Sequence, residues 1–124
     1  MVFLMTNGEG MRGGRLNHNI ADHPFIGEAE TAPKYRFFSV RDEFPGLLPV
    51  GPGGGTVRGE LYDVPLEVIR DKFLPDEPPE LELGVVELAD GTATLSMVLR
   101  DSERDRHKEI TELGGWRAYR TSLS

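Results

Sequence analysis

The chain begins with an apolar run that leads into a glycine-rich bend, Val2-Phe3-Leu4-Met5-Thr6-Asn7-Gly8-Glu9-Gly10-Met11-Arg12-Gly13-Gly14-Arg15-Leu16-Asn17. The apolar residues predict a buried strand that ends at Thr6. Four glycines within seven residues let the backbone turn sharply and approach a ligand closely, because no Cβ is in the way. Successive backbone N–H groups in such a turn can converge on an anion. We therefore expect a small anionic ligand at this bend, and a purely structural turn is the alternative.

The same bend also matches a nucleotide-binding pattern, because Gly8, Gly10 and Gly13 fit G-x-G-x-x-G. That pattern requires a full helix after the third glycine, within a strand–helix–strand unit. Here Pro24 limits the helical stretch to residues 16–21. We therefore expect no nucleotide cofactor at the bend.

The rest of the chain predicts an α+β domain with about six short strands and one or two short helices. Pro65 suits the first position of a helix, which we expect to end before Pro75. In the tail, Trp116 and Tyr119 are expected to anchor either a helix or an extended segment on the core. The predicted strands and extended pieces are residues 25–31, 35–40, 47–50, 56–64, 81–88 and 92–100. No repeat or long linker divides the sequence, so we expect one domain over residues 1–124, with a mixed or antiparallel sheet that can curl into a barrel.

The charge balance narrows the class of partner. The formal net charge of −7 disfavours nucleic acid and anionic membranes. Ten acidic and two basic residues lie between Glu60 and Asp90, so an anion site is expected among the arginines of the bend and the tail. The absence of cysteine excludes disulfides and thiol catalysis. The run at residues 2–5 is too short for the apolar part of a signal peptide, so we expect a cytoplasmic protein.

Few side chains outside the bend have the spacing of a catalytic or metal site. His18, His23 and His107 lack metal-ligand spacing, so we expect no metal. Glu80 and Glu82 alternate with leucines and therefore share one face of a strand. Two interpretations of Glu82 stay open: it belongs to a solvated acidic face, or it projects into a cavity, where burial raises its pKa and makes it a general acid/base.

Several blocks of the chain, in order and nearly end to end, resemble the C-terminal domain of allophanate hydrolase. They are Asn7-Gly8 with Met11-Arg12-Gly13-Gly14 and Leu16-Asn17, Thr31-Ala32-Pro33-Lys34-Tyr35-Arg36-Phe37-Phe38-Ser39-Val40 with Phe44-Pro45-Gly46-Leu47, Gly59-Glu60-Leu61-Tyr62-Asp63-Val64-Pro65, Pro78-Pro79-Glu80-Leu81-Glu82-Leu83-Gly84, and Glu109-Ile110-Thr111 with Gly114-Gly115-Trp116-Arg117-Ala118-Tyr119. The resemblance implies a γ-glutamylcyclotransferase-like (AIG2-like) fold, a mixed or antiparallel β-barrel of about six strands with one or two short helices.

The resemblance also implies a substrate loop and an acid/base. In this superfamily the loop after the first strand binds a small substrate through backbone N–H groups, and the matching positions are Asn7, Gly8, Glu9, Gly10 and Met11. The superfamily usually has Tyr-Gly where this chain has Asn7-Gly8. Its catalytic glutamate directly precedes Gly-Val, where this chain has Leu83, and the nearest carboxylate is Glu82. Glu82 is therefore the candidate acid/base for a γ-glutamyl cyclotransferase reaction that releases pyroglutamate, although a shift of one residue along a strand reverses the face.

Allophanate hydrolases pair this domain with an amidase domain, and nothing in this chain resembles that amidase. The resemblance therefore implies an accessory domain that stands alone and decarboxylates the N-carboxycarbamate that an amidase releases. We expect a mouth formed by the bend, Tyr35-Arg36 and the turn Pro45-Gly46, in which Arg12, Arg36 or Arg41 holds a carboxylate. Tyr35 is a candidate proton donor, and His18 is another. A non-catalytic partner of a separate amidase subunit is the remaining alternative.

Overall fold

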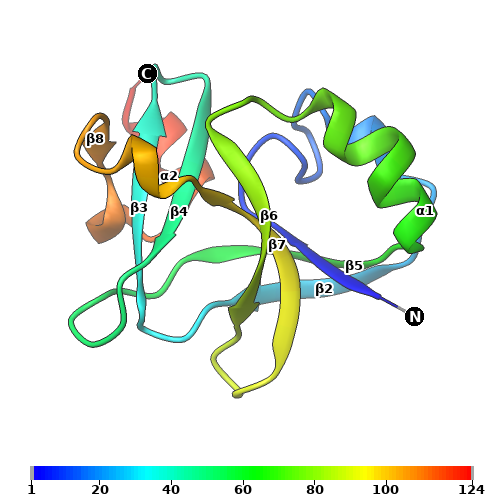
Figure 1. Cartoon of the computed structure of the whole chain (residues 1–124), viewed down its shortest axis with the longest axis horizontal. Helices are drawn as coiled ribbons and strands as arrows, with labels where there is room; N and C mark the ends of the chain where they lie inside the picture. Colours follow the sequence, from blue (N-terminus) through cyan, green and yellow to red (C-terminus); the bar gives the residue numbers. More distant parts are fainter. Residues whose placement is uncertain (1, 124) are drawn as a thin grey trace.

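Two β-sheets form the framework of the computed structural model, which describes residues 2–123 (Figure 1). The larger sheet has the strand order β2-β5-β1-β7-β6, and the smaller one has the order β4-β3-β8. The strands are β1 (Phe3–Thr6), β2 (Phe25–Glu30), β3 (Tyr35–Val40), β4 (Phe44–Pro49), β5 (Arg58–Asp63), β6 (Leu81–Glu87), β7 (Ala93–Leu99) and β8 (Lys108–Glu109). The helical segments are η1 (Asn17–Asn19), α1 (Leu66–Val68), η2 (Ile69–Phe73), η3 (Leu74–Asp76), η4 (Asp101–Glu103), η5 (Thr111–Leu113) and α2 (Trp116–Ser122).

Strand β1 lies in the centre of the larger sheet, antiparallel to β5 and parallel to β7. Its neighbouring residues Leu4 and Met5 are 0% and 1% exposed and belong to two separate apolar clusters. Because successive side chains point to opposite faces of a strand, both faces of β1 are covered. This explains why the first strand reads as a continuous apolar run rather than an alternating one.

The expected α+β class with a mixed sheet is confirmed, but the strands do not close into one barrel. They form separate sheets of five and three strands over residues 2–123. The smaller sheet is antiparallel throughout, whereas the larger one contains the parallel pair β1–β7. The apolar clusters fill the space between the sheets and beside them, so the core forms without closure.

The prediction of a turn at Pro45-Gly46 is wrong, because both residues lie inside strand β4. The chain reverses instead at Arg41 and Asp42, whose φ angles are 55° and 58°. Two successive residues with positive φ form the kind of tight turn that joins antiparallel strands. Pro45 can occupy the strand because β4 is at the edge of its sheet, where a missing N–H breaks no ladder.

The helix expected to stop before Pro75 continues past it and ends at Asp76. Its α-helical turn α1 is followed by the π-helical turn η2 and the 3-10 turn η3 without a break. Pro75 lies at the start of η3, where it displaces no helical hydrogen bond of that turn. Glu77 is therefore the first residue after this helical run, and it begins the connection to β6.

The tail ends in a helix, which was one of the two structures expected for it. Gly114 has a φ of 73° and separates η5 from α2. Trp116 and Tyr119, on α2, are 3% and 2% exposed, so their predicted anchoring role is confirmed. Among residues 2–123, no helix has the length and apolar character required to cross a membrane.

Candidate functional site

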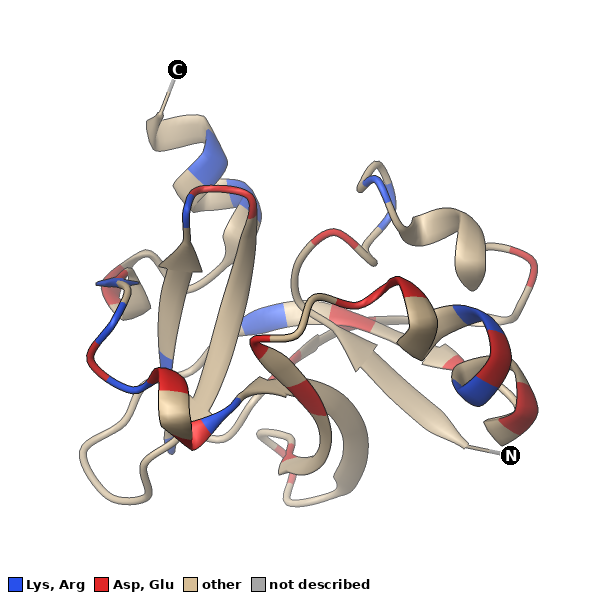
Figure 2. Ribbon diagram, turned by 45° about the horizontal axis from the view of Figure 1, so that its top comes forward, with Lys and Arg blue, Asp and Glu red and all other residues tan. Residues whose placement is uncertain are grey.

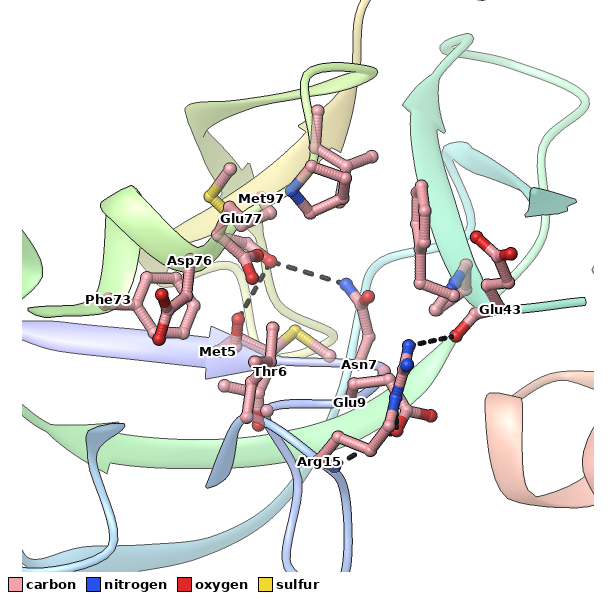
Figure 3. Close-up of a pocket in the computed structure, with 18 of the residues that line it drawn as sticks. Met5, Thr6, Asn7, Glu9, Arg15, Glu43, Phe73, Asp76, Glu77 and Met97 are labelled. Atoms are coloured by element: carbon pink, nitrogen blue, oxygen red, sulfur yellow. Dashed lines mark hydrogen bonds and ion pairs between the residues drawn. The ribbon is translucent and has the colours of Figure 1, made fainter. Parts of the chain in front are cut away.

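A pocket of about 320 Å³ opens where β1 ends and the glycine-rich bend begins. We call residues 7–15 the glycine loop. The pocket lies between this loop, the β3–β4 hairpin, the connection after η3, and strand β7 (Figure 3). Each of these four segments comes from a different part of the sequence, so the pocket exists only in the folded chain.

Gly8 brings the glycine loop against the β3–β4 hairpin. A Cβ added at Gly8 would come within 2.6 Å of Pro45 Cγ, a distance that real Cβ atoms essentially never show. The close approach therefore requires glycine at this position. It also places Asn7, Gly8, Glu9, Gly10 and Pro45 at one pocket, as the sequence led us to expect of the mouth.

Three successive N–H groups of the glycine loop are free to bind a ligand. Among residues 2–123, the backbone N–H groups of Gly8, Glu9 and Gly10 have no protein acceptor. Farther along the loop the backbone N–H groups are no longer all unpaired, since the Arg12 N–H donates to Glu60 Oε1 at 2.7 Å. Unpaired successive amides of this kind suit an anion.

Glu77 is the candidate general acid of the pocket, although the sequence alone did not point to this residue. It follows η3 directly, is half-buried, and lines the pocket. Burial and, to a smaller extent, the neighbouring charge of Asp76 raise its pKa from an ordinary 4.5 to about 7. Figure 3 shows Glu77 beside Met97, on the wall that faces Asn7. A carboxyl group with such a pKa can both donate and accept a proton near neutral pH.

Asn7 and Ser96 form a buried polar pair at the floor of the pocket. Asn7 Nδ2 donates to Ser96 Oγ at 3.4 Å, and Ser96 Oγ donates to the carbonyl of Met5 at 2.9 Å. Ser96 is 0% exposed and Asn7 is 8% exposed. Both residues line the pocket.

The arginines that line the pocket are already paired with acidic groups. Arg15 Nε lies 3.4 Å from Glu9 Oε1, and Arg15 also donates to the carbonyl of Glu43 at 3.3 Å. Arg41 Nη1 lies 2.6 Å from Glu80 Oε2, and its Nε lies 3.2 Å from Glu43 Oε1. Acidic residues also lie along the helical run and the connection after it (Figure 2). The strongly positive pocket expected from the sequence is therefore not present.

Glu82, Tyr35 and Arg36 lie outside this pocket. The Glu82 side chain is 46% exposed and pairs with Arg100 at 3.1 Å, so it belongs to a solvated face of β6. The Tyr35 hydroxyl accepts a hydrogen bond from the Glu87 N–H at 2.8 Å. Arg36 is exposed on β3. Tyr35 and Arg36 pair with Pro49 and Leu48, so they lie at the end of the β3–β4 hairpin away from the turn that lines the pocket.

The remaining expected ligand contacts, Met11, Arg12 and Gly46, also lie outside the pocket. Met11 is 5% exposed and faces a second hollow beside α2. Arg12 turns to Glu60, with Nε 3.0 Å from Oε2. Gly46 approaches Leu99, because an added Cβ would come within 2.7 Å of Leu99 Cδ1. These three positions support the loop and the hairpin rather than line the pocket.

Helix α2 holds both the glycine loop and the β3–β4 hairpin. Trp116 Nε1 donates to Glu9 Oε2 at 2.8 Å, and the Tyr119 hydroxyl donates to Asp42 Oδ1 at 2.6 Å. Burial favours the neutral form of Glu9, but hydrogen bonds from Trp116 and from Arg15 hold its pKa below the ordinary value. The last helix of the chain therefore fixes two segments that form the pocket.

Comparison with known protein families gave one match that covers nearly the whole chain. The family described as the allophanate hydrolase C-terminal domain matches residues 2–121. A search of curated protein sequences found no match.

Solved structures with the same arrangement include a uropathogenic E. coli-specific protein. It has 36% sequence identity and a TM-score of 0.90, and the match covers 97% of this chain and 95% of that one. Kluyveromyces lactis allophanate hydrolase has 25% identity and a TM-score of 0.88 over 99% of this chain, which spans only 21% of that enzyme. An AIG2-like protein from Mus musculus has 22% identity and a TM-score of 0.61, covering 82% of this chain and 78% of that one. The last likeness confirms the expected AIG2-like fold.

Proposed function

Because the chain belongs to the allophanate hydrolase C-terminal domain family, we propose that its pocket binds a small carboxylate-bearing metabolite derived from urea and transfers a proton to it. One observation carries the proposal: Glu77, with a pKa of about 7, lines the same pocket as three unpaired amides of the glycine loop. A ligand held by those amides lies within the pocket that also contains the acid. The arrangement therefore supports binding and proton transfer at one place.

In this proposal, backbone N–H groups bind the ligand's carboxylate, and no unpaired arginine or lysine side chain takes part. The N–H groups of Gly8, Glu9 and Gly10 supply donors, whereas Arg15 and Arg41 are occupied by acidic partners. Protonated Glu77 adds an O–H donor, which a carboxylate accepts as a short, charge-assisted hydrogen bond. Binding therefore favours the protonated form of Glu77, because an anion beside it raises its pKa still further.

The reaction that fits this arrangement is decarboxylation of N-carboxycarbamate. The bond between its nitrogen and one carboxylate carbon breaks, carbon dioxide leaves, and the electron pair of the bond stays on nitrogen. Glu77 gives its proton to that nitrogen, so the second product is carbamate, and solvent then reprotonates Glu77. A separate amidase domain or subunit supplies the substrate, since K. lactis allophanate hydrolase is about five times longer than the region that this chain matches.

The test compares wild type with Glu77→Gln and with the control Glu82→Gln. The protein is added to an allophanate-hydrolysing amidase, and release of carbon dioxide and ammonia is followed over time. We expect wild type and Glu82→Gln to accelerate release, and Glu77→Gln to lose the acceleration by about a hundredfold or more, which is typical of a lost general acid. An equal rate with and without wild type overturns the decarboxylation.

A second assay separates this reaction from the cyclotransferase alternative. The protein is incubated with γ-glutamyl amines, and pyroglutamate is measured. We expect none to form. Pyroglutamate release that is lost in Glu77→Gln but kept in Glu82→Gln would assign the same acid to cyclotransferase chemistry instead.

A further inference from the structure

Ser96 determines which way the amide group of Asn7 points. A backbone carbonyl can only accept a hydrogen bond, so the contact of 2.9 Å between Ser96 Oγ and Met5 O uses the single hydroxyl proton of Ser96. Toward Asn7, Ser96 Oγ can then act only as an acceptor. The group of Asn7 that faces it at 3.4 Å must be the Nδ2 donor. The hydrogen bond from Ser96 to Met5 therefore fixes which end of the Asn7 amide faces Ser96.

The other end of the amide, Asn7 Oδ1, is an open acceptor in the pocket. Within residues 2–123, no donor of the protein bonds to it, and it is not among the buried unpaired side-chain atoms of that range. Asn7 is 8% exposed, and the pocket is the space that it lines. Figure 3 shows Asn7 reaching into this space from the end of β1, with Glu77 on the facing wall.

We propose that Asn7 is a specificity-determining residue, which selects carboxylates that also carry an amide or carbamoyl N–H. This inference rests on the proposed function, because it takes the carboxylate to be bound by the amides of the glycine loop. Asn7 directly precedes the first of those free amides at Gly8, so the N–H and the carboxylate of the ligand must be only a few bonds apart.

The selection comes from the energy of an unpaired acceptor. A ligand that fills the pocket displaces water from Asn7 Oδ1, and an N–H restores the lost hydrogen bond. A methyl group in the same place leaves the oxygen unpaired, and sites that hydrogen-bond a polar group reject analogues that lack it. The net worth of one neutral hydrogen bond corresponds to about a tenfold difference in affinity.

Oxamate and pyruvate provide a matched pair of probes. Both are small monoanions with a carbonyl beside the carboxylate, and they differ by an amino group in place of a methyl group. Binding is measured by calorimetry and by chemical-shift titration of the glycine loop amides. We expect wild type to bind oxamate about tenfold more tightly than pyruvate.

Two variants connect this ratio to Asn7. In Ser96→Ala the amide loses its fixed orientation, and in Asn7→Ala the acceptor is absent. We expect both ratios to fall to about one; in Asn7→Ala pyruvate should bind more tightly, because it no longer leaves an acceptor unpaired. Thr94→Val is the matched control, because the Thr94 hydroxyl lies on the same strand but donates to the carbonyl of Phe3, outside the pocket. It should keep the wild-type ratio.

The outcomes separate this inference from the function on which it rests. Failure of wild type to bind either anion overturns the proposed function and the inference together. Equal affinity for both anions overturns the selection by Asn7 and leaves anion binding in place. A tenfold ratio that persists in both variants also overturns it, because the N–H would then be recognised by another group.

Discussion

Glu60 and Glu77 lie on different sides of the glycine loop, and their carboxyl groups have opposite acidities. Glu60 is 0% exposed and accepts hydrogen bonds from the Arg12 N–H, from Arg12 Nε at 3.0 Å and from Arg117 Nη2 at 3.0 Å. Burial favours its neutral form, but these bonds hold its pKa below the ordinary value. In the part of the chain that the structure describes, Glu77 has no such donors, and burial raises its pKa to about 7.

The difference shows that hydrogen bonds from arginine and N–H donors outweigh the effect of burial at Glu60, whereas burial prevails at Glu77. Around Glu77 the causes of the shift are desolvation and the like charge of Asp76, and no basic group within residues 2–123 opposes them. On the Glu60 side, cationic and N–H donors hold the loop in place. On the Glu77 side, the acid and the loop amides keep their binding capacity for a ligand.

The largest effect is expected from Glu60→Ala. It removes a buried carboxylate whose three hydrogen bonds from Arg12 and Arg117 join the glycine loop to α2, so we expect a loss of about 4 kcal/mol in the free energy of unfolding. Urea denaturation measures it. The control is Glu28→Ala, an exposed residue that lies opposite Glu60 on β2. A loss in Glu60→Ala no larger than in the control contradicts this role of Glu60.

Glu77→Gln is expected to stabilise the protein at alkaline pH. The folded-state pKa of Glu77 is raised to about 7 from 4.5, so the stability that comes from its protonated form is complete below pH 4.5 and is lost as the pH rises through 7. Glutamine does not ionise. The variant should therefore match wild type at pH 4 and exceed it by about 3 kcal/mol at pH 8. Urea unfolding at both pH values tests this, and a difference that does not vary with pH contradicts it.

Trp116→Phe removes one donor on the supporting side while keeping an aromatic ring. Loss of the bond from Trp116 Nε1 to the Glu9 carboxylate should lower the free energy of unfolding by about 2 kcal/mol. Because that bond also lowers the pKa of Glu9, the pKa should rise in the variant. Chemical denaturation and an NMR titration of Glu9 give the two readouts. An unchanged Glu9 pKa would show that Trp116 serves only as apolar packing.

The smallest effect is expected from Tyr119→Phe. Its hydroxyl donates to Asp42 in the exposed β3–β4 turn, where water can replace the lost bond, so the destabilisation should be smaller than in Trp116→Phe. Faster amide exchange should be confined to the hairpin. Exchange that increases equally in the glycine loop would show that α2 holds the two segments as one unit.

The fold class could be predicted because it depends on local patterns. The apolar run at residues 2–5 identifies a strand, and the alternation of apolar and polar residues in β7 identifies another, although its polar Thr94 and Ser96 are buried. The β3–β4 turn was misplaced, since Pro45-Gly46 has a typical turn composition but lies in an edge strand. Arg41 and Asp42 carry no comparable sequence signature for positive φ.

Part of the candidate site could be predicted for the same local reason. Asn7, Gly8, Glu9 and Gly10 are consecutive, so a strand that ends in glycines brings them to one place. Glu77 was missed because it is one of many acids in the acidic middle of the chain, and only its position after the helical run distinguishes it. The family resemblance made Glu82 the candidate acid, but its exposure depends on the register of β6 against β7, with Glu82 opposite Val98.

The amino-acid sequence by itself determined the strand that ends in a glycine loop, the α+β class and the family resemblance, because these follow from neighbouring residues and their periodicity. Only the tertiary structure decided which carboxyl group is the acid, which arginines are already occupied and which atom of Asn7 is open to a ligand. Those properties depend on distances between segments far apart in the chain. Desolvation and pairing act through such distances, and no local pattern encodes them.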